Sequence, residues 1–286
     1  MVKVSVVMPN YNKKEYISLA IDSVLKQTHS DFELVIVDDG STDGSQNIIE
    51  QYAKKDNRII VLNHEKNVGI SKSCNDGIKS SKGEAICLLG SDDIYSPEKL
   101  ELQLSALHSS NDTVVYCDWF SLSKDGIISR ENHKLLEETG FIFPSLLGRS
   151  MIANAQVMIP KWCLNTLGRM FDESLDVCED YDLLLALSRR FSFVYVPKSL
   201  YGYRIYDDNV SSKSNRRWRY AQKAKVLRRY VDDPILSKSQ RLAAYRNLVM
   251  CDVASRNYGK IAQGLVTRKN YLIAMNRALR SRARLQ

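Results

Sequence analysis

Three pairs of acidic residues mark points where an apolar segment ends or a helix begins: Asp38-Asp39, Asp92-Asp93 and Glu179-Asp180. The first pair follows the apolar run 34–37, and the second follows the run 85–89 after a Gly-Ser step. A short apolar run that ends in acid and glycine is typical of a buried parallel strand that leads into a loop. Ligands of open α/β sheets bind at the carboxyl ends of the strands. Because two acidic pairs at one edge repel each other, we expect a divalent metal with a phosphorylated ligand between them.

Strand-like and helix-like patterns alternate over the first hundred residues. Predicted strands cover 4–8, 32–37, 58–62, 84–89 and 113–117, and predicted helices cover 13–27, 43–54, 69–80 and 97–107. Alternation with short links implies parallel strands joined by right-handed crossovers. The sequence therefore predicts an α/β fold with a mainly parallel central sheet.

The pattern loosens after residue 117. We expect a turn at 124–126 between short strands and a mixture of loop and short helix over 131–155. Further strands are expected at 156–159, 193–196 and 200–205, and helices at 179–190, 215–231, 237–257 and 260–282. This predicts one α/β domain over residues 1–213, with halves at 1–117 and 118–213, followed by a helical region over 214–286.

The charge is unevenly distributed along the chain. Residues 214–286 hold 18 Lys and Arg against three acidic residues, whereas residues 1–213 hold 23 against 30. Such asymmetry indicates an anionic partner for the basic region alone. A solvated helical appendage, a nucleic-acid arm and a membrane-surface element are the alternatives. Basic side chains interleaved with Trp and Tyr over 216–230 favour an anionic membrane surface, and we expect no nucleic-acid partner because no known nucleic-acid module is present.

Cysteine spacing and hydropathy indicate a cellular compartment. The six cysteines form no C-x-x-C motif, which fits a reduced, cytoplasmic chain without disulfides. No apolar stretch approaches 18 residues, so we expect no membrane-spanning helix and, at most, peripheral association with the inner face of the plasma membrane. The four histidines lack zinc-site spacing.

Five motifs occur in the order and spacing of a known family: residues 4–12, 37–43, 67–78, 89–97 and 168–183. Over roughly residues 3–211 the chain resembles the family-2 nucleotide-sugar glycosyltransferases, which have the GT-A fold. The resemblance implies that a sugar moves from a UDP-sugar to a saccharide or lipid-linked acceptor with inversion at the anomeric carbon. It also implies a bacterial surface-polysaccharide pathway and Mn²⁺ or Mg²⁺ as cofactor.

The resemblance assigns the nucleotide site residue by residue. Pro9, Tyr11 and Asp39 would frame the uracil, and Asp38 would position that loop or the nucleotide. Asp92 would bind the metal ion that bridges the two phosphates. The remaining residues assigned to nucleotide binding are Asn67, Gly69, Lys72 and Ser91.

The resemblance also assigns residues on the acceptor side. Asp180 would be the catalytic base for the acceptor hydroxyl, with Glu179 beside it. Asp93 would orient its loop or touch ribose or sugar hydroxyls, and Arg204 would lie near the diphosphate or the acceptor. Trp119 could stack on a sugar, although packing in the core or a loop is the more common role of such a residue.

Three positions depart from the family pattern. Gly90 replaces the first Asp of a D-x-D motif, Cys74 replaces an Arg, and Tyr206 replaces a His. Lys72 could supply the charge that Cys74 lacks. With one carboxylate, metal affinity in the absence of nucleotide should be weak.

Each acidic pair also has a purely structural interpretation. Asp38-Asp39 could form a turn before a helix cap, Asp92-Asp93 could cap the helix after Pro97, and Glu179-Asp180 could stabilise a helix N-terminus. A nucleotidyltransferase and a catalytically impaired nucleotide-sugar-binding or scaffold protein are the alternative functions. The motifs G-x-G-x-x-G and G-x-x-x-x-G-K-[ST] are absent, which disfavours dehydrogenases and P-loop enzymes.

Overall fold

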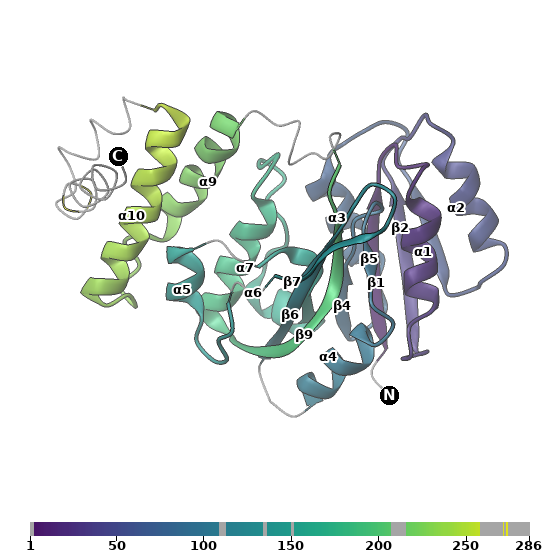
Figure 1. The fold of residues 1–286 in the computed structure, drawn as a ribbon, viewed down its shortest axis with the longest axis horizontal. Coiled ribbons are helices and arrows are strands. Elements are labelled where there is room, and N and C mark those ends of the chain that lie inside the picture. The colour runs from purple at the N-terminus through teal and green to yellow at the C-terminus, as the bar shows by residue number, and fades with distance from the viewer. Residues whose placement is uncertain are drawn as a thin grey trace. The chain divides into compact units, whose positions relative to one another are not determined.

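The computed structural model describes residues 3–108, 113–133, 136–149, 152–206 and 216–257, together with 271 and 273. The chain divides into two compact units (Figure 1). Unit 1 comprises Met1–Gly140 and Ile152–Tyr206, and unit 2 comprises Phe141–Met151 and Asp207–Gln286. The predicted boundary between residues 213 and 214 lies outside the described residues.

Unit 1 is built on a sheet whose first four strands are parallel. These are β1 (Val4–Asn10), β2 (Phe32–Asp38), β3 (Ile59–Asn63) and β4 (Ala85–Leu88). Their order is β3-β2-β1-β4, and the register pairs Asn10 with Asp38 and Val7 with Leu88. The ends of β1, β2 and β4 therefore lie along one edge of the sheet, as the sequence pattern predicts.

The other half of the sheet is mixed. It consists of β5 (Ile94–Tyr95), β6 (Thr113–Leu122), β7 (Ile128–His133), β8 (Val157–Pro160) and β9 (Ser192–Arg204). Strand β8 is antiparallel to both β4 and β6, whereas β6 and β9 are parallel. Strands β5 and β7 pair antiparallel with β9 and β6, respectively. The α/β prediction is confirmed.

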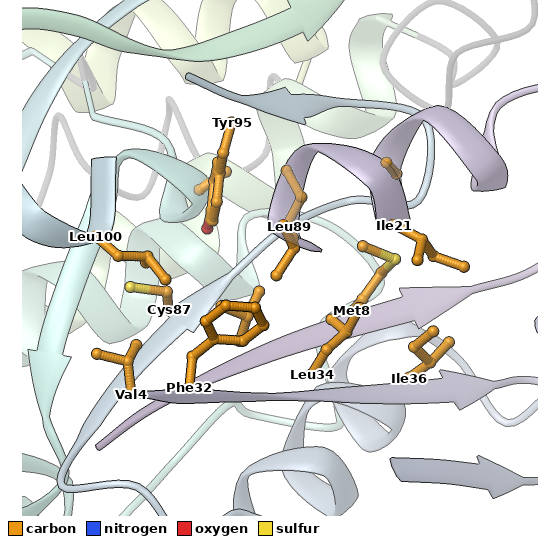
Figure 2. Close-up of a cluster of buried hydrophobic side chains, with 14 of the residues drawn as sticks. Val4, Met8, Ile21, Phe32, Leu34, Ile36, Cys87, Leu89, Tyr95 and Leu100 are labelled. Atoms are coloured by element: carbon orange, nitrogen blue, oxygen red, sulfur yellow. The ribbon is translucent and has the colours of Figure 1, made fainter. Parts of the chain in front are cut away.

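Helices cover both faces of the parallel strands. They include α1 (Ile17–Leu25), α2 (Ser45–Ala53), α3 (Ile70–Ser80) and α4 (Lys99–His108), followed by η1 (Asn154–Gln156), α6 (Lys161–Leu167) and α7 (Glu179–Arg190). Side chains of β1 alternate between faces. Met8 packs in the core cluster that includes Ile21 of α1 and Leu34 and Ile36 of β2 (Figure 2). Val7 faces α3, where Gly77 allows close approach.

Unit 2 contains α5 (Phe143–Gly148), α9 (Arg216–Tyr230) and α10 (Lys238–Ser255). Helix α10 begins with a capping box in which Ser237 accepts a hydrogen bond from the Gln240 amide. Asp252 is fully buried and forms an ion pair with Arg228 of α9. The two predicted helices at 215–231 and 237–257 match α9 and α10, whereas nearly all of the predicted helix 260–282 lies outside the described residues.

Three local predictions were wrong. Residues 193–196 and 200–205 belong to one strand, β9, which continues through a register shift opposite Asp118 of β6. Strand β6 runs on to Leu122 instead of ending at residue 117. Helix α6 was not predicted. Among the residues that the structure describes, no helix combines the length and apolarity needed to cross a membrane.

Candidate active site

Asp38 holds together the loop that follows β2. Its buried carboxylate accepts hydrogen bonds from Nδ2 of Asn10 at 2.7 Å, Nε2 of Gln46 at 2.6 Å and the backbone amide of Ser41 at 3.0 Å. Three donors offset the cost of burying a carboxylate. These contacts fit the expectation that Asp38 positions the loop.

Asp39 connects β2 to the loop before α3. Its Oδ1 accepts hydrogen bonds from the Val68 amide at 2.9 Å and from Nδ1 of His64 at 2.8 Å, and its Oδ2 accepts one from the Gly69 amide at 2.9 Å. Gly69 has φ +95°, a conformation that favours glycine. Oδ1 of Asn67 also accepts from the Gly69 amide, at 3.1 Å. The structure thus brings Asp39, Asn67 and Gly69 together.

Tyr11 follows directly at the end of β1. Its side chain is 45% exposed, and Pro9, two residues earlier, is half-buried. The amide of Asp39 donates to the carbonyl of Asn10 at 2.8 Å, so the backbones on either side of this edge are joined. The Tyr11 ring is therefore exposed next to this edge and is not part of the core.

His64 and Asp76 were not predicted as site residues. Nε2 of His64 lies 3.3 Å from Oδ2 of Asp76 on α3, while its Nδ1 bonds Asp39. Lys72, one helical turn before Asp76, places its ammonium 2.6 and 2.7 Å from the two Asp76 oxygens. The predicted nucleotide ligand Lys72 therefore belongs to a chain of contacts through Asp76 and His64 to Asp39. The sequence gave no signal for this role of His64, because its four histidines are isolated and lack the spacing of metal ligands.

Asp93 supports the loop after β4. It is buried, and it accepts hydrogen bonds from the Tyr201 hydroxyl at 2.6 Å and the Arg204 amide at 2.8 Å. Burial, with the nearby charge of Asp92, raises the pKa of Asp93 to about 8. Nε of Arg204 donates to the carbonyl of Asp92 at 2.8 Å, and its Nη1 donates to the carbonyl of Lys124 at 3.0 Å. Arg204 is 1% exposed, so it braces this loop from within.

Asp92 lies beside a lysine. Its Oδ2 is 2.8 Å from Nζ of Lys13 and accepts a hydrogen bond from the Tyr206 hydroxyl at 2.6 Å. Burial and the charge of Asp92 raise the pKa of Tyr206, so this side chain remains a neutral donor. The adjacent Ser91 is buried.

The side chains near Asp92 offer few ligands to the predicted Mn²⁺ or Mg²⁺ ion. Within the described part of the chain, no group of three or more His, Cys, Asp or Glu side chains could hold a metal ion. Asp92 contributes one carboxylate, and one of its oxygens already contacts an ammonium and a phenol. A hard cation prefers several oxygen ligands and is repelled by an adjacent ammonium. The described residues therefore do not fit a metal ion held by the protein.

Glu179 and Asp180 begin α7. Burial raises the pKa of Glu179 to about 8, with the charge of Asp180 as the second cause, and burial also raises the pKa of Asp180. The Asp180 carboxylate accepts a hydrogen bond from the Tyr181 amide at 2.7 Å. A carboxylate with a raised pKa is suited to removing a proton near neutral pH. A helix N-terminus alone would lower the pKa of an acidic side chain, so the interpretation of this pair as helix-terminal charge does not account for the raised pKa values of Glu179 and Asp180.

Helix α3 connects the two sides of the site. Nδ2 of Asn75 donates to the carbonyl of Phe171 at 3.0 Å and to Oε1 of Glu173 at 2.9 Å, and Oδ1 accepts from the Phe171 amide at 3.0 Å. Cys74 is buried, and the charges of Glu179 and Asp180 add to burial in raising its pKa. The same helix thus connects to Asp39 through His64 and Asp76, and holds the segment before α7 through Asn75.

Trp119 packs inside unit 1. Its ring meets that of Tyr203 edge to face with a centroid separation of 5.9 Å, and it lies partly buried against the core cluster. This contact agrees with a packing role and leaves sugar stacking a prediction.

Comparison with known proteins identifies the family. The model of glycosyl transferase family 2 matches residues 5–160, more than half of the chain. Glycosyltransferases of Rickettsia bellii, Rickettsia typhi and Rickettsia prowazekii, all named as uncharacterized, are 32–34% identical over 71–73% of this chain. The chain spans only 30%, 66% and 64% of their respective lengths.

Two further relatives match over most of their own length. TuaG of Bacillus subtilis (strain 168), whose name assigns it to teichuronic acid biosynthesis, is 29% identical over 80% of this chain and 88% of TuaG. WfgD of Escherichia coli, named as a UDP-Glc:α-D-GlcNAc-diphosphoundecaprenol β-1,3-glucosyltransferase, is 29% identical over 81% of this chain and 88% of WfgD.

The fold matches that of a solved enzyme. The crystal structure of S. aureus TarS 1–349 in complex with UDP-GlcNAc superposes with a TM-score of 0.71 and 20% identity, over 95% of this chain and 79% of that structure. This likeness confirms the GT-A architecture. The family model and the relatives show that the chain belongs to glycosyl transferase family 2.

Proposed function

We propose that this chain transfers a sugar from a UDP-sugar to a hydroxyl of a saccharide or lipid-linked acceptor, with inversion at the anomeric carbon. The supporting observation is that the carboxylate of Asp39 is fixed at the sheet edge by the amides of Val68 and Gly69, while a half-buried acidic pair with raised pKa values begins α7. A single displacement needs such a base for the acceptor hydroxyl in addition to a donor site.

The nucleotide lies at the edge formed by β1 and β2 in this proposal. Tyr11 offers an exposed ring for the base, with Pro9 behind it. Oδ2 of Asp39 accepts one hydrogen bond, from Gly69, and a carboxylate oxygen can accept a second. The imide N–H of uracil is a matching donor. The loop residue Asn67 would line the same edge, while Ser91 would support the loop next to the phosphates.

The chemical step requires one base. The acceptor oxygen attacks the anomeric carbon, and the bond between that carbon and the phosphate oxygen breaks. Its electron pair remains on UDP, while Asp180 takes the hydroxyl proton. One displacement inverts the anomeric centre, and the resemblance suggests no carboxylate nucleophile for a second displacement. Burial and the mutual charge of the pair raise the pKa of Glu179, and burial raises that of Asp180, so the pair readily holds the proton that the hydroxyl releases.

In this scheme several predicted residues have a supporting role and hold other residues of the site in place. Asp93 and Arg204 hold the backbone that carries Asp92, and Lys72 holds Asp76. Contacts of Asp93, Arg204 and Trp119 with ribose, sugar or acceptor remain predictions.

The relatives suggest the pathway. TuaG is assigned to teichuronic acid biosynthesis, and WfgD acts on a diphosphoundecaprenol-linked sugar. TarS was crystallised with UDP-GlcNAc. We infer a role in bacterial surface-polysaccharide assembly, in the cytoplasm, with a hexose or N-acetylhexosamine as the transferred group.

UDP release tests the proposed reaction. The protein is incubated with a panel of UDP-sugars and polyprenyl-diphosphate-linked acceptors, and the product's anomeric configuration is read by NMR. Asp180→Asn should lower turnover by about 10²–10⁴-fold, the usual contribution of a general base. Glu50→Gln, which changes an exposed acid on α2, is the control. Turnover that survives Asp180→Asn, or a product with retained configuration, would contradict the proposal.

A second part of the proposal concerns the basic helix α9. Arg216 and Lys225 are exposed, whereas Arg228 is engaged by Asp252 and Tyr230 is buried. We propose that exposed residues of α9 bind an anionic membrane surface, where each basic side chain contributes about 1 kcal/mol. The double variant Arg216→Glu/Lys225→Glu should lose binding to phosphatidylglycerol vesicles. The matched variant Lys54→Glu/Lys55→Glu should retain it, and equal binding by both would defeat this idea.

A further inference from the structure

Lys13 lies in the turn between β1 and α1, two residues after Tyr11. Its carbonyl accepts hydrogen bonds from the amides of Tyr16 and Ile17, both at 2.9 Å, so the first turn of α1 fixes its backbone. Its side chain is 19% exposed. This position lies between the predicted uridine site and the loop that carries Asp92.

The ammonium of Lys13 has two partners in this loop region. Nζ lies 2.8 Å from Oδ2 of Asp92 and donates to the Tyr206 hydroxyl, which in turn donates to the same Asp92 oxygen at 2.6 Å. A carboxylate and a phenol therefore hold one cation in a defined place.

Residue 90 is a glycine and cannot supply a second carboxylate for a metal ion beside Asp92. A Cβ at Gly90 would lie 3.1 Å from Oδ1 of Asp92 and 3.3 Å from Oδ2 of Asp93, so an acidic side chain here would crowd two carboxylates. Without it, Asp92 offers one carboxylate, whose charge Lys13 balances. A divalent ion at Oδ2 would have to displace that ammonium.

We propose that the Lys13 ammonium, held by Asp92 and Tyr206, is the cation that faces the donor diphosphate, so that this chain binds UDP without a divalent metal ion. The inference rests on the proposed function. In the transfer step, Lys13 keeps its proton and only stabilises the charge that the breaking sugar–phosphate bond leaves on UDP. Lysine is an established phosphate partner as a point charge. The Mn²⁺ or Mg²⁺ ion expected from the family resemblance is the competing outcome of the test.

Calorimetric titration with UDP tests this assignment on the full chain, in EDTA and in Mn²⁺. The wild type should bind with the same Kd, within about threefold, in both buffers. Lys13→Met should weaken binding in EDTA by about tenfold or more, the scale of a lost charged hydrogen bond. Mn²⁺ should partly restore it, because Asp92 is then free to bind the ion.

Two further variants serve as controls. Lys14→Met removes the same charge one residue away, from an exposed side chain, and should bind like the wild type. Lys13→Arg keeps the charge and should retain most of the affinity in EDTA, and thermal melting confirms that each variant is folded.

Three results would overturn the inference. Loss of wild-type UDP binding in EDTA would establish a required metal ion. Unchanged binding by Lys13→Met in EDTA would remove Lys13 from the diphosphate site. Absence of wild-type UDP binding in both buffers would contradict the proposed function itself, and with it this inference.

Discussion

Nδ1 of His64 lies 2.8 Å from Oδ1 of Asp39, and the other ring nitrogen lies 3.3 Å from Asp76 on α3. The imidazole therefore links the sheet edge to the helix that holds the segment before α7 through Asn75. Because a carboxylate can only accept, Nδ1 carries the proton in this contact, and the orientation of Asp39 depends on His64.

His64→Ala should weaken UDP binding by about tenfold, because a charged hydrogen bond contributes about 1.5–3 kcal/mol and 1.4 kcal/mol corresponds to tenfold. Titration calorimetry measures this change. His29→Ala, in the loop between α1 and β2, provides the control, and its affinity should match the wild type. Equal affinities for both variants would show that His64 does not position Asp39.

The pH dependence of kcat/KM should show an acidic limb above the ordinary carboxylate range of about 3.9–4.3. Burial raises the pKa of Asp180, so the base gains its proton, and activity falls, at a higher pH than for an exposed aspartate. Initial rates from pH 4 to 9, with stability checked at each pH, measure the limb. An acidic limb at the ordinary carboxylate pKa would show that Asp180 is not the base.

The same burial should make the fold less stable as pH rises. The carboxyls of Asp93 and Glu179 have pKa values of about 8, above their unfolded values, so the native state binds more protons between about pH 4 and 8. Their contribution to the free energy of unfolding therefore falls across this window. Urea unfolding of the wild type and the Asp93→Asn variant at pH 5 and 8 tests the sign: the variant should lose less stability than the wild type between the two pH values. A wild-type decline no larger than that of the variant would exclude Asp93 as a cause.

Asn75→Ala should lower the free energy of unfolding by about 1–3 kcal/mol, because it leaves the buried backbone groups of Phe171 without their partners. It should also reduce turnover, since the segment before α7 loses its attachment to α3. Urea denaturation and UDP release provide the two readouts. Asn47→Ala, on the exposed side of α2, should change neither. A stable, fully active Asn75→Ala variant would show that this attachment is dispensable.

Gly77→Ala should destabilise unit 1 by about 1–3 kcal/mol despite the better helix propensity of alanine. The new Cβ would lie 2.4 Å from Cγ1 of Val7 and 3.1 Å from Cγ2 of Val37. Combining it with Val7→Ala should cost less than the sum of the two single changes, because the smaller partner relieves the clash. Strict additivity would mean that α3 shifts away instead.

The strands and helices of the first hundred residues could be predicted because their patterns are local. Both faces of β1 and β2 are covered, so apart from Ser5 and Glu33 their sequences are apolar until each ends in a polar residue at the sheet edge. Strand β9 could not be predicted as one element, because the polar step at 197–199 resembles a loop. Its pairing with β6 continues through a register shift that only the tertiary structure specifies.

The acidic residues of the site could be recognised, but their partners could not. Asp39, Asp92 and Asp180 stand in motifs and were assigned roles. Lys13 and His64 stand outside the functional assignments, and Asp76, although it lies in the motif at 67–78, was assigned no role; all three act through contacts between side chains that no local pattern specifies. The resemblance places Arg204 near the diphosphate or the acceptor. Its guanidinium donates to backbone carbonyls of Asp92 and Lys124, and contact with either ligand stays a prediction.

The central claim is that the edge of β1 and β2 binds uridine through Asp39. Titration of the wild type and Asp39→Asn with UDP, and of the wild type with ADP and GDP, tests it most directly. We predict saturable one-to-one binding of UDP, at least about tenfold weaker binding of ADP and GDP, and a loss of about tenfold or more in Asp39→Asn. Equal binding of all three nucleotides, or UDP binding that is unchanged in a folded Asp39→Asn variant, would contradict it.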